Sequence, residues 1–430
     1  MSDTLGSNPF GPVARQRLRD QIAAMRAAHL GNLAADTADD ADYNYLFDPR
    51  HLLVRTTDLP ALRDTAADLG AEFAGPAALP ETLITTGLTR YPPPRVAATG
   101  AVDIPRVLQR LEVVNPALVG RVTPDHFLHV SKVGGSCCPA TEPEVTTSAV
   151  PSPRRTTNAA AGTGVRVAVV DTGLCQNAVG NPATPWLQGV TGDADSQGCG
   201  PTLRTYSGHG TFIAGIIRCL APMAEVRVAS FLEGHGGAIR ESDMVTQLVK
   251  ILSWNPDVLN LSAGTNTRKG RKLLSFEWLW EDHLQARQTT TVLVAAAGNN
   301  SSAQAFWPAS FDWATGVGSL DRATGTVSKF SNIIHAPDVY ALGDDIVNAF
   351  PVGTYICREA PNQGKKRTFT NGFAQWSGTS FAAPIVAGMI AARTSATLRA
   401  PGARDAVLAS AVQASEPGIG TYRALRPPYS

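Results

Sequence analysis

Residues 165–170 read VRVAVV, and the chain continues directly into Asp171-Thr172-Gly173. A near-continuous apolar run of this kind is typical of a strand that is buried on both faces of a parallel sheet. Three later stretches have the same character: VRVAS (226–230), VLNLS (258–262) and TVLVAAAG (291–298). Together the four runs predict a largely parallel sheet in the second half of the chain.

Helical patterns separate the predicted strands. Residues 210–220 (GTFIAGIIRCL) form one, a second begins after Ser242, and residues 276–287 form a third. Strands that alternate with helices indicate βαβ units, whose crossovers cover both faces of the sheet. The sequence therefore predicts an α/β fold with a mostly parallel central sheet and helices on both faces, over residues 163–430.

A smaller unit precedes this sheet. Residues 51–55 (HLLVR) and 127–131 (FLHVS) are strand candidates, and Asp58 and Asp103 are expected to cap two helices between them. This order suits a small α+β domain with two helices on one face of a sheet. The predicted organisation is an N-terminal tail with one amphipathic helix (1–42), the α+β domain (43–135), a linker rich in Gly, Pro, Ser and Thr (136–162) and the main domain (163–430).

The composition argues against several classes of function. The 430 residues contain 37 Lys and Arg against 36 Asp and Glu, so the formal net charge is +1. Nucleic-acid and anionic-membrane binders normally show a basic excess, and we expect neither partner. The sequence shows no apolar stretch of the roughly 18 residues that a membrane span needs, and no secretory signal. These observations favour the cytoplasm and leave open secretion by an unrecognised route.

Three short blocks of polar residues stand at the ends of predicted elements. Asp171-Thr172-Gly173 follows the first strand, Gly208-His209-Gly210-Thr211 opens a helix, and Ser377-Gly378-Thr379-Ser380 opens another. In a parallel sheet such groups collect at the carboxyl ends of the strands, so we expect them to meet. A serine hydroxyl needs an adjacent base, and a buried aspartate orients a histidine for that task. We therefore predict Ser380 as a nucleophile, His209 as its general base and acid, and Asp171 as the residue that orients His209.

Acyl transfer also needs hydrogen-bond donors for the oxyanion that develops on the attacked carbonyl. Asn299 ends the run Ala295-Ala296-Ala297-Gly298-Asn299 at the same edge of the sheet and can supply a side-chain N–H. Ser380 lies at a helix N-terminus, where its own backbone N–H and the helix dipole can help. Asn299 is therefore the predicted oxyanion donor.

The three blocks resemble the signatures of the subtilisin-like serine peptidases, the subtilase family. Gly208-His209-Gly210-Thr211 and GTSFAAP (378–384) together are highly specific, whereas Asp171-Thr172-Gly173 alone is a weak signal. The order Asp, His, Ser is the order found in subtilisin. Each block alone fits a turn, a glycine-rich loop or a helix cap, but jointly and in order they favour catalysis. The resemblance covers about residues 163–400.

The resemblance implies a substrate-binding region. Leu261-Ser262-Ala263-Gly264 is similar to the strand that binds substrate and lines the primary specificity pocket of the family. The resemblance makes Ser262, Ala263, Gly264, Ala296, Ala297 and Gly298 the substrate-binding candidates. The floor of the pocket is expected near Ala296-Ala297 and Ser310-Phe311.

The resemblance also suggests a role for the N-terminal region. Many members are made with an α+β prodomain that assists folding and then occupies the substrate cleft as an inhibitor. Residues 43–135 fit such a prodomain in size, position and element pattern, and an unrelated sensing or docking domain is the alternative. Cleavage is expected between Val133 and Thr163. The partner of the main domain would then be its own N-terminal domain.

The chemistry requires no cofactor, and the sequence offers no metal-ligand series. Calcium stabilises many family members, but Asp193-Ala194-Asp195 is interpreted here as a solvated turn. Cys175 and Cys199 could pair in an oxidising environment, although the cytoplasmic prediction favours free thiols. The adjacent Cys137-Cys138 are also expected to be free, because a vicinal disulfide is strained.

The sequence thus predicts a serine endopeptidase that cleaves protein or peptide substrates through an acyl-enzyme, with N-terminal autoprocessing of a zymogen as a further hypothesis. An esterase-like serine hydrolase is disfavoured. Gly378-x-Ser380-x-Ala382 lacks the second glycine of the nucleophile elbow, and the triad order of those enzymes differs. The non-enzymatic alternative is a peptidase-fold protein that its N-terminal domain keeps inhibited and that acts as a regulated or binding module.

Overall fold

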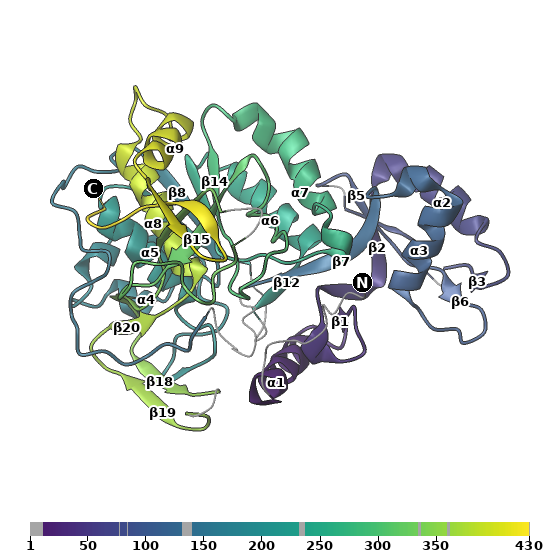
Figure 1. Cartoon of the computed structure of the whole chain (residues 1–430), viewed down its shortest axis with the longest axis horizontal. Helices are drawn as coiled ribbons and strands as arrows, with labels where there is room; N and C mark the ends of the chain where they lie inside the picture. The colour runs from purple at the N-terminus through teal and green to yellow at the C-terminus, as the bar shows by residue number, and fades with distance from the viewer. Residues whose placement is uncertain are drawn as a thin grey trace.

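The computed structural model describes residues 12–76, 78–83, 85–130, 140–231, 237–333, 337–358 and 362–429. Two parts lie side by side in Figure 1: a larger part coloured teal to yellow, and a smaller N-terminal part coloured purple and blue. Cys137-Cys138 and Val133, where the expected cleavage window begins, lie outside the described residues. None of the described helices combines the length and apolar character needed to cross a membrane.

The larger part is built on one predominantly parallel sheet. Every neighbouring pair in it is parallel except the two C-terminal strands, which form an antiparallel ribbon at one edge. The four apolar runs that predicted strands are central in this sheet, so the predicted α/β class is confirmed. In sheet order the strands are β21 (Val412–Glu416), β22 (Gly420–Ala424), β16 (Val339–Leu342), β15 (Ala314–Leu320), β14 (Val292–Ala296), β13 (Val258–Leu261), β8 (Arg166–Asp171), β11 (Glu225–Ser230) and β9 (Thr191–Gly192).

Helices cover both faces of this sheet because its strands are apolar on both sides. Val167 and Val169 of β8 pack in one core with α5 and α8, while Ala168 and Val170 pack in a second core with α6 and α7. The third predicted helix is shorter than expected, because α7 gives way to a π-helical turn at Trp280–Leu284. The helices are α4 (Gln176–Val179), α5 (His209–Leu220), α6 (Glu241–Leu252), α7 (Leu274–Leu279), α8 (Thr379–Arg393) and α9 (Ala400–Ala409).

Two small sheets flank the core of the larger part. One pairs β17 (Ile346–Ala349) with β20 (Phe373–Trp376), and the other joins β10 (Thr202–Leu203), β18 (Gly353–Ile356) and β19 (Lys366–Phe369). Residues 140–162 lie along this part and are held by its backbone. Ala140 N donates to Ser377 O (2.9 Å), and Ser152 N donates to Val347 O (2.7 Å).

The N-terminal part has an antiparallel sheet with two helices packed on one of its faces. One strand of this sheet, β12, comes from the larger part and pairs with β7, so the sheet joins the two parts (Figure 1). The elements are α1 (Pro12–Ala28), β1 (Ala34–Ala35), β2 (Leu46–Arg55), α2 (Leu59–Ala67), β3 (Phe73–Ala74), β4 (Glu81–Leu83), β5 (Leu88–Tyr91), β6 (Arg95–Val96), α3 (Ile104–Val114), β7 (Val122–His129) and β12 (Ala238–Arg240).

The predicted helix caps have different outcomes. Asp103 accepts a hydrogen bond from Arg106 N (3.1 Å) and caps α3 as predicted. Asp58 stands at the start of α2 but makes no capping bond, because its carboxylate accepts from Arg121 Nε (3.1 Å). The amphipathic helix predicted in the N-terminal tail is α1, whose Leu18, Ile22 and Met25 are buried against the Phe127 side chain.

Buried ionisable groups join the N-terminal part to the first turn of α6. Asp125 of β7 accepts hydrogen bonds from Ser242 N (3.3 Å) and Ser242 Oγ (2.6 Å), and Arg90 Nε lies 3.1 Å from the same carboxylate. Beside it, His126 Nδ1 lies 2.7 Å from Glu241 Oε1. Burial raises the pKa of Asp125 to about 6, against the partly compensating charge of Arg90.

This raised pKa predicts that the interface loses stability as the pH rises. A carboxyl group whose pKa is higher in the folded state stabilises that state below pH 4, and this contribution is lost as the pH rises through 6. In the full-length Ser380→Ala chain, we expect Asp125→Asn to remove about 2 kcal/mol of the decline in unfolding free energy between pH 4 and pH 7. Urea unfolding at the two pH values measures this difference.

The exposed helix cap Asp103 provides the matched control. In Asp103→Asn, the free energy of unfolding should decline between pH 4 and pH 7 by as much as it does in the parent chain. Equal declines in the parent and in Asp125→Asn would contradict the prediction.

Candidate active site

The structure gathers the three predicted residues at one edge of the parallel sheet. Asp171 is the last residue of β8, His209 is the first residue of α5, and Ser380 is the second residue of α8. All three side chains are buried in the full-length chain. The carboxyl ends of the strands thus bring together residues that are far apart in the sequence, as expected for a parallel sheet.

Asp171 and His209 form a direct pair. His209 Nδ1 lies 2.7 Å from Asp171 Oδ1, and the imidazole packs against the rings of Trp376 and Phe381. An ionised carboxylate only accepts hydrogen bonds, so the proton of the neutral imidazole resides on Nδ1. This arrangement leaves the lone pair on Nε2 available to act as a base. Among the described residues, Nε2 makes no hydrogen bond.

Two glycines around His209 are required by close contacts. Gly208 has a φ of +79°, and a β-carbon there would lie 2.5 Å from Pro351 Cδ. A β-carbon on Gly210 would lie 2.6 Å from Gly173 O. Larger residues at either position would therefore displace the segment that carries the imidazole.

Asp195 supports the Asp171–His209 pair and is not the solvated residue that the sequence suggested. Its side chain is buried, and Oδ2 accepts hydrogen bonds from Thr172 Oγ1 (3.1 Å) and Gly208 N (2.9 Å). Each donor is next in sequence to one member of the pair. Burial raises the pKa of Asp195 to about 6. Asp193 and Ala194 of the same turn are exposed, so the prediction failed for Asp195 alone, which the hydrogen bond from Gly208 N ties to the loop before His209.

A disulfide joins Cys175 to Cys199 beside the Asp195 carboxylate. The sequence favoured free thiols at these two positions, so that prediction was wrong. The two sulfurs and the Asp195 carboxylate are the one group of potential metal ligands within the described ranges. Its sulfur atoms are bonded to each other, and calcium takes oxygen ligands. This set therefore does not fit the calcium ion considered for the family.

The start of α8 is tied to the predicted substrate-binding strand. Pro384 has no N–H and cannot donate to the carbonyl of Ser380, four residues earlier in the helix. Ser262 Oγ donates to Ser380 O instead, over 3.1 Å. In return, Ser380 Oγ is 3.5 Å from Ser262 O, at the limit of a hydrogen bond. The described residues show no hydrogen bond between Ser380 Oγ and His209, so the hydroxyl is not yet engaged by the base.

Asn299 lies at the same helix start. Its Oδ1 accepts hydrogen bonds from Thr379 N (2.7 Å) and Thr379 Oγ1 (2.9 Å). These two bonds orient the amide so that its Nδ2 group is left to donate elsewhere. The orientation suits the predicted role as an oxyanion donor next to Ser380.

A small cavity of about 10 Å³ lies beside Ser380. Its walls include Ser262, Ala263 and Gly264 on one side and Ala296 and Gly298 on the other. Ala297 does not line the cavity. It is buried, and its N–H donates to Val317 O of the neighbouring strand (3.0 Å). The expected floor at Ser310-Phe311 is wrong, because Phe306 lines the cavity in that place. The apolar sequence around Phe306 carries no motif that would have identified it.

The N-terminal part reaches this cavity with the end of β7. His129 N donates to Gly264 O (3.0 Å), Gly264 N donates to His129 O (3.1 Å), and Val130 N donates to Gly237 O (3.1 Å). His129 and Val130 also line the cavity beside Ser380. The chain therefore lies as an antiparallel strand along the predicted substrate-binding strand. No sequence signal singled out these two residues.

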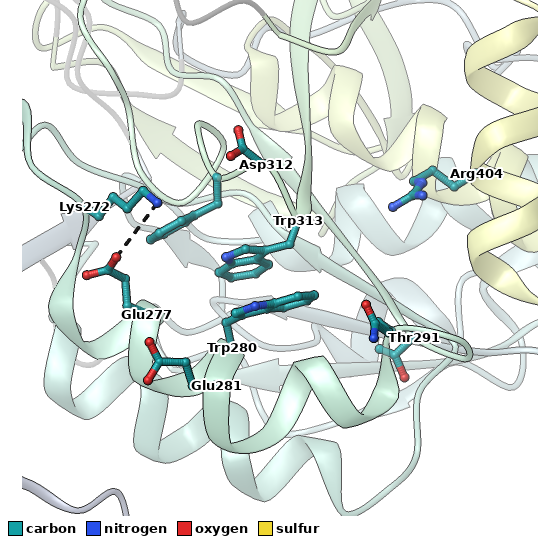
Figure 2. A pocket seen from close by; sticks show the side chains of 10 residues that line it. Lys272, Glu277, Trp280, Glu281, Thr291, Asp312, Trp313 and Arg404 are labelled. Carbon is teal, nitrogen blue, oxygen red and sulfur yellow. Dashed lines mark ion pairs between the residues drawn. The ribbon is translucent and has the colours of Figure 1, made fainter.

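A second cavity, of about 550 Å³, is lined by none of the predicted catalytic residues. Trp280 and Trp313 stack on each other in it, with ring centroids 5.1 Å apart, and Glu277 and Glu281 lie beside them (Figure 2). Phe311, which was expected at the pocket floor, lines this second cavity instead.

Comparisons with known proteins place this fold and site in one family. The sequence model of the subtilase family matches residues 162–419. A thermophilic serine proteinase of Bacillus sp. (strain AK1) is 30% identical over 225 residues, which cover 50% of this chain and 49% of that protein. The chain thus spans about half the length of that relative. Thermitase of Thermoactinomyces vulgaris is 29% identical over 278 residues, covering 61% of this chain and 86% of thermitase.

Two solved structures are similar to part of the chain. The patellamide maturation protease PatA superposes with a TM-score of 0.46 and 25% identity, covering 60% of this chain and 90% of PatA. A cold-adapted subtilisin-like serine proteinase gives a TM-score of 0.45 and 23% identity, covering 61% of this chain and 89% of that one. On the family match, the chain belongs to the subtilase family of serine peptidases, which confirms the resemblance.

The orientation of Asn299 predicts a loss in turnover when its amide is removed. We expect Asn299→Leu to lower kcat by about 10² to 10³ with little change in KM, the loss seen when an oxyanion donor is removed from subtilisin, a member of the same family. Steady-state hydrolysis of a peptide substrate measures both constants.

Thr379→Val separates this loss from loosening of the helix start. The valine variant removes the bond from Thr379 Oγ1 to Asn299 Oδ1 and the bond that Thr379 Oγ1 accepts from Gly298 N (3.2 Å). It keeps the backbone bond from Thr379 N to Asn299 Oδ1. We expect a clearly smaller loss in kcat than for Asn299→Leu. Equal losses in the two variants would assign the effect to structure and not to oxyanion stabilisation.

Proposed function

We propose that this chain is a serine endopeptidase that hydrolyses peptide bonds in protein or peptide substrates through an acyl-enzyme. The observation that carries the proposal is the 2.7 Å contact between His209 Nδ1 and Asp171 Oδ1, next to the helix start that presents Ser380. Ser380 is the nucleophile, His209 the general base and acid, Asp171 the residue that orients it, and Asn299 the oxyanion donor.

The first half of the reaction forms the acyl-enzyme. Ser380 Oγ attacks the substrate carbonyl carbon while His209 Nε2 takes the hydroxyl proton. The negative charge that develops on the carbonyl oxygen is stabilised by the Asn299 Nδ2 group and the Ser380 backbone N–H. The C–N bond then breaks, and His209 gives the proton to the leaving amine. Asp171 stabilises the imidazolium throughout.

The second half repeats these steps with water. His209 takes a proton from a water molecule that attacks the acyl carbon, and the proton returns to Ser380 Oγ as the ester bond breaks. Residues of this chain make every proton transfer, so the proposal needs no cofactor. Substrate residues on the acyl side of the bond would pair with Ser262, Ala263 and Gly264, as added strands pair with an exposed sheet edge.

We also propose that the N-terminal part inhibits the enzyme until the enzyme removes it. The backbone bonds of His129 and Val130 occupy the groups on Gly264 and Gly237 that a substrate strand would use. Asp125 and His126 add buried contacts to Ser242 and Glu241 at the start of α6. The chain that follows Val130 would then be cut by Ser380, either in the same molecule or in another.

The compartment is part of this proposal. The disulfide between Cys175 and Cys199 favours an oxidising environment, where such bonds persist. Secretion by a route that the sequence does not reveal would supply that environment. The cytoplasmic assignment made from the sequence remains a prediction.

Intact-mass spectrometry over time tests both proposals on the purified full-length chain. We expect the wild type to lose its N-terminal part through a cut in the predicted window between Val133 and Thr163. Ser380→Ala should stay at full length, because the nucleophile is absent. Hydrolysis of denatured casein by the same samples reports activity on other chains.

Ser253→Ala is the matched control, because this exposed serine lies at the end of α6 and contacts only Lys250 O among the described residues. It should be processed as the wild type is. Loss of the N-terminal part in Ser380→Ala would point to a contaminating protease. If every variant stays at full length and casein is not cut, the chain is a retained, inhibited module, as in the non-enzymatic alternative.

A further inference from the structure

With the N-terminal part in place, the cavity beside Ser380 is small, and His129 and Val130 are among its walls. Its volume of about 10 Å³ is close to the minimum that holds one water molecule. A peptide bond attacked by Ser380 would place the side chain of its acyl-side residue, the residue that contributes the carbonyl, in this cavity. The residue that closes the cavity therefore decides which substrates fit.

Phe306 closes it. A β-carbon built on Gly264 would overlap the Phe306 ring, and one built on Gly298 would lie 3.0 Å from Phe306 Cδ1. Gly264 and Gly298 belong to the two opposite walls of the cavity. A ring in contact with both walls fills the space between them. The Phe306 side chain is itself buried, so it is part of the packed interior and not a surface group.

The segment around Phe306 is held from several directions. Phe306 N donates to Ser310 Oγ (3.0 Å), and Trp307 exchanges two backbone hydrogen bonds of 2.8 Å with Thr265, directly after the wall residue Gly264. These bonds fix the backbone that carries Phe306, and the packed interior around the buried ring restricts its rotation.

Stacked aromatic rings support the same segment from behind. The Trp307 ring packs on Phe311 with centroids 4.6 Å apart, and Phe311 stacks on Trp313 at 4.7 Å. Trp313 in turn stacks on Trp280, the pair drawn in Figure 2. A dense stack of this kind resists displacement, because each ring would lose its contacts with the next.

We propose that Phe306 determines specificity by restricting the acyl-side residue of the substrate to glycine, alanine or serine. The proposal rests on the proposed function, because it concerns the substrates of the same site. Larger side chains would have to overlap the Phe306 ring, and one methylene group too many in such a pocket changes selectivity by about 10- to 200-fold.

The test uses the purified full chain together with any product of its own cleavage. Two succinyl-tetrapeptide p-nitroanilides that differ only in the acyl-side residue, alanine or phenylalanine, serve as substrates. We expect kcat/KM for the alanine substrate to exceed that for the phenylalanine substrate at least about tenfold. In Phe306→Ala, this ratio should fall at least about tenfold, because the cavity then admits the larger ring.

Phe306→Leu covers the case in which the alanine variant does not fold, and the ratio should fall there too, by less. Phe369→Leu is the matched control: the same change at a buried ring that packs on Phe350 and does not line the cavity. In Phe369→Leu, the ratio of kcat/KM for the alanine substrate to that for the phenylalanine substrate should equal the wild-type ratio. A fall as large as that of Phe306→Leu would overturn the proposal.

Two other results would also overturn it. A wild-type preference for phenylalanine, or an unchanged ratio in both Phe306 variants, would overturn the role of Phe306 while the proposed peptidase activity stands. If neither nitroanilide nor denatured casein is hydrolysed in a Ser380-dependent way, the proposed function itself fails and this inference fails with it. The casein arm thus distinguishes the two failures.

Discussion

The segment 262–264, which directly follows the strand β13, is the part of the chain on which the rest of the site depends. On one side it holds the nucleophile helix, because Ser262 Oγ fills the place of the hydrogen bond that Pro384 cannot donate to Ser380 O. On the other side it pairs with His129 through two backbone bonds at Gly264. A shift of this segment would therefore change the position of the nucleophile and of any bound chain together.

This double role connects inhibition with substrate binding. The N–H and C=O groups that receive the end of β7 are sheet-edge groups, and such groups are open to any extended chain. The N-terminal part adds a second set of contacts at the start of α6, where Asp125 and Ser242 are both buried. The N-terminal chain and a substrate would compete for the same backbone groups, and the buried contacts at α6 favour the chain that is covalently attached.

The predictions that succeeded rest on local patterns. The apolar run at 165–170 became the central strand β8, and the residues that follow the strands met at one edge of the sheet. The failures concern burial by distant segments. Asp195 looked like a turn residue, yet it is buried, and a hydrogen bond from Gly208 N ties it to the loop before His209. Phe306 had no pattern to distinguish it from any core residue.

The sequence by itself determined the sheet, the order of its elements and the three blocks that carry the chemistry, because apolar periodicity and glycine requirements act over a few neighbouring residues. Only the tertiary structure decided what fills the site. That His129 and Val130 lie along the cavity follows from contacts between segments more than a hundred residues apart in the chain. That Phe306 closes it follows from contacts with Gly264 and Gly298, which belong to the two opposite walls. Such contacts depend on how whole layers pack, which no local pattern records.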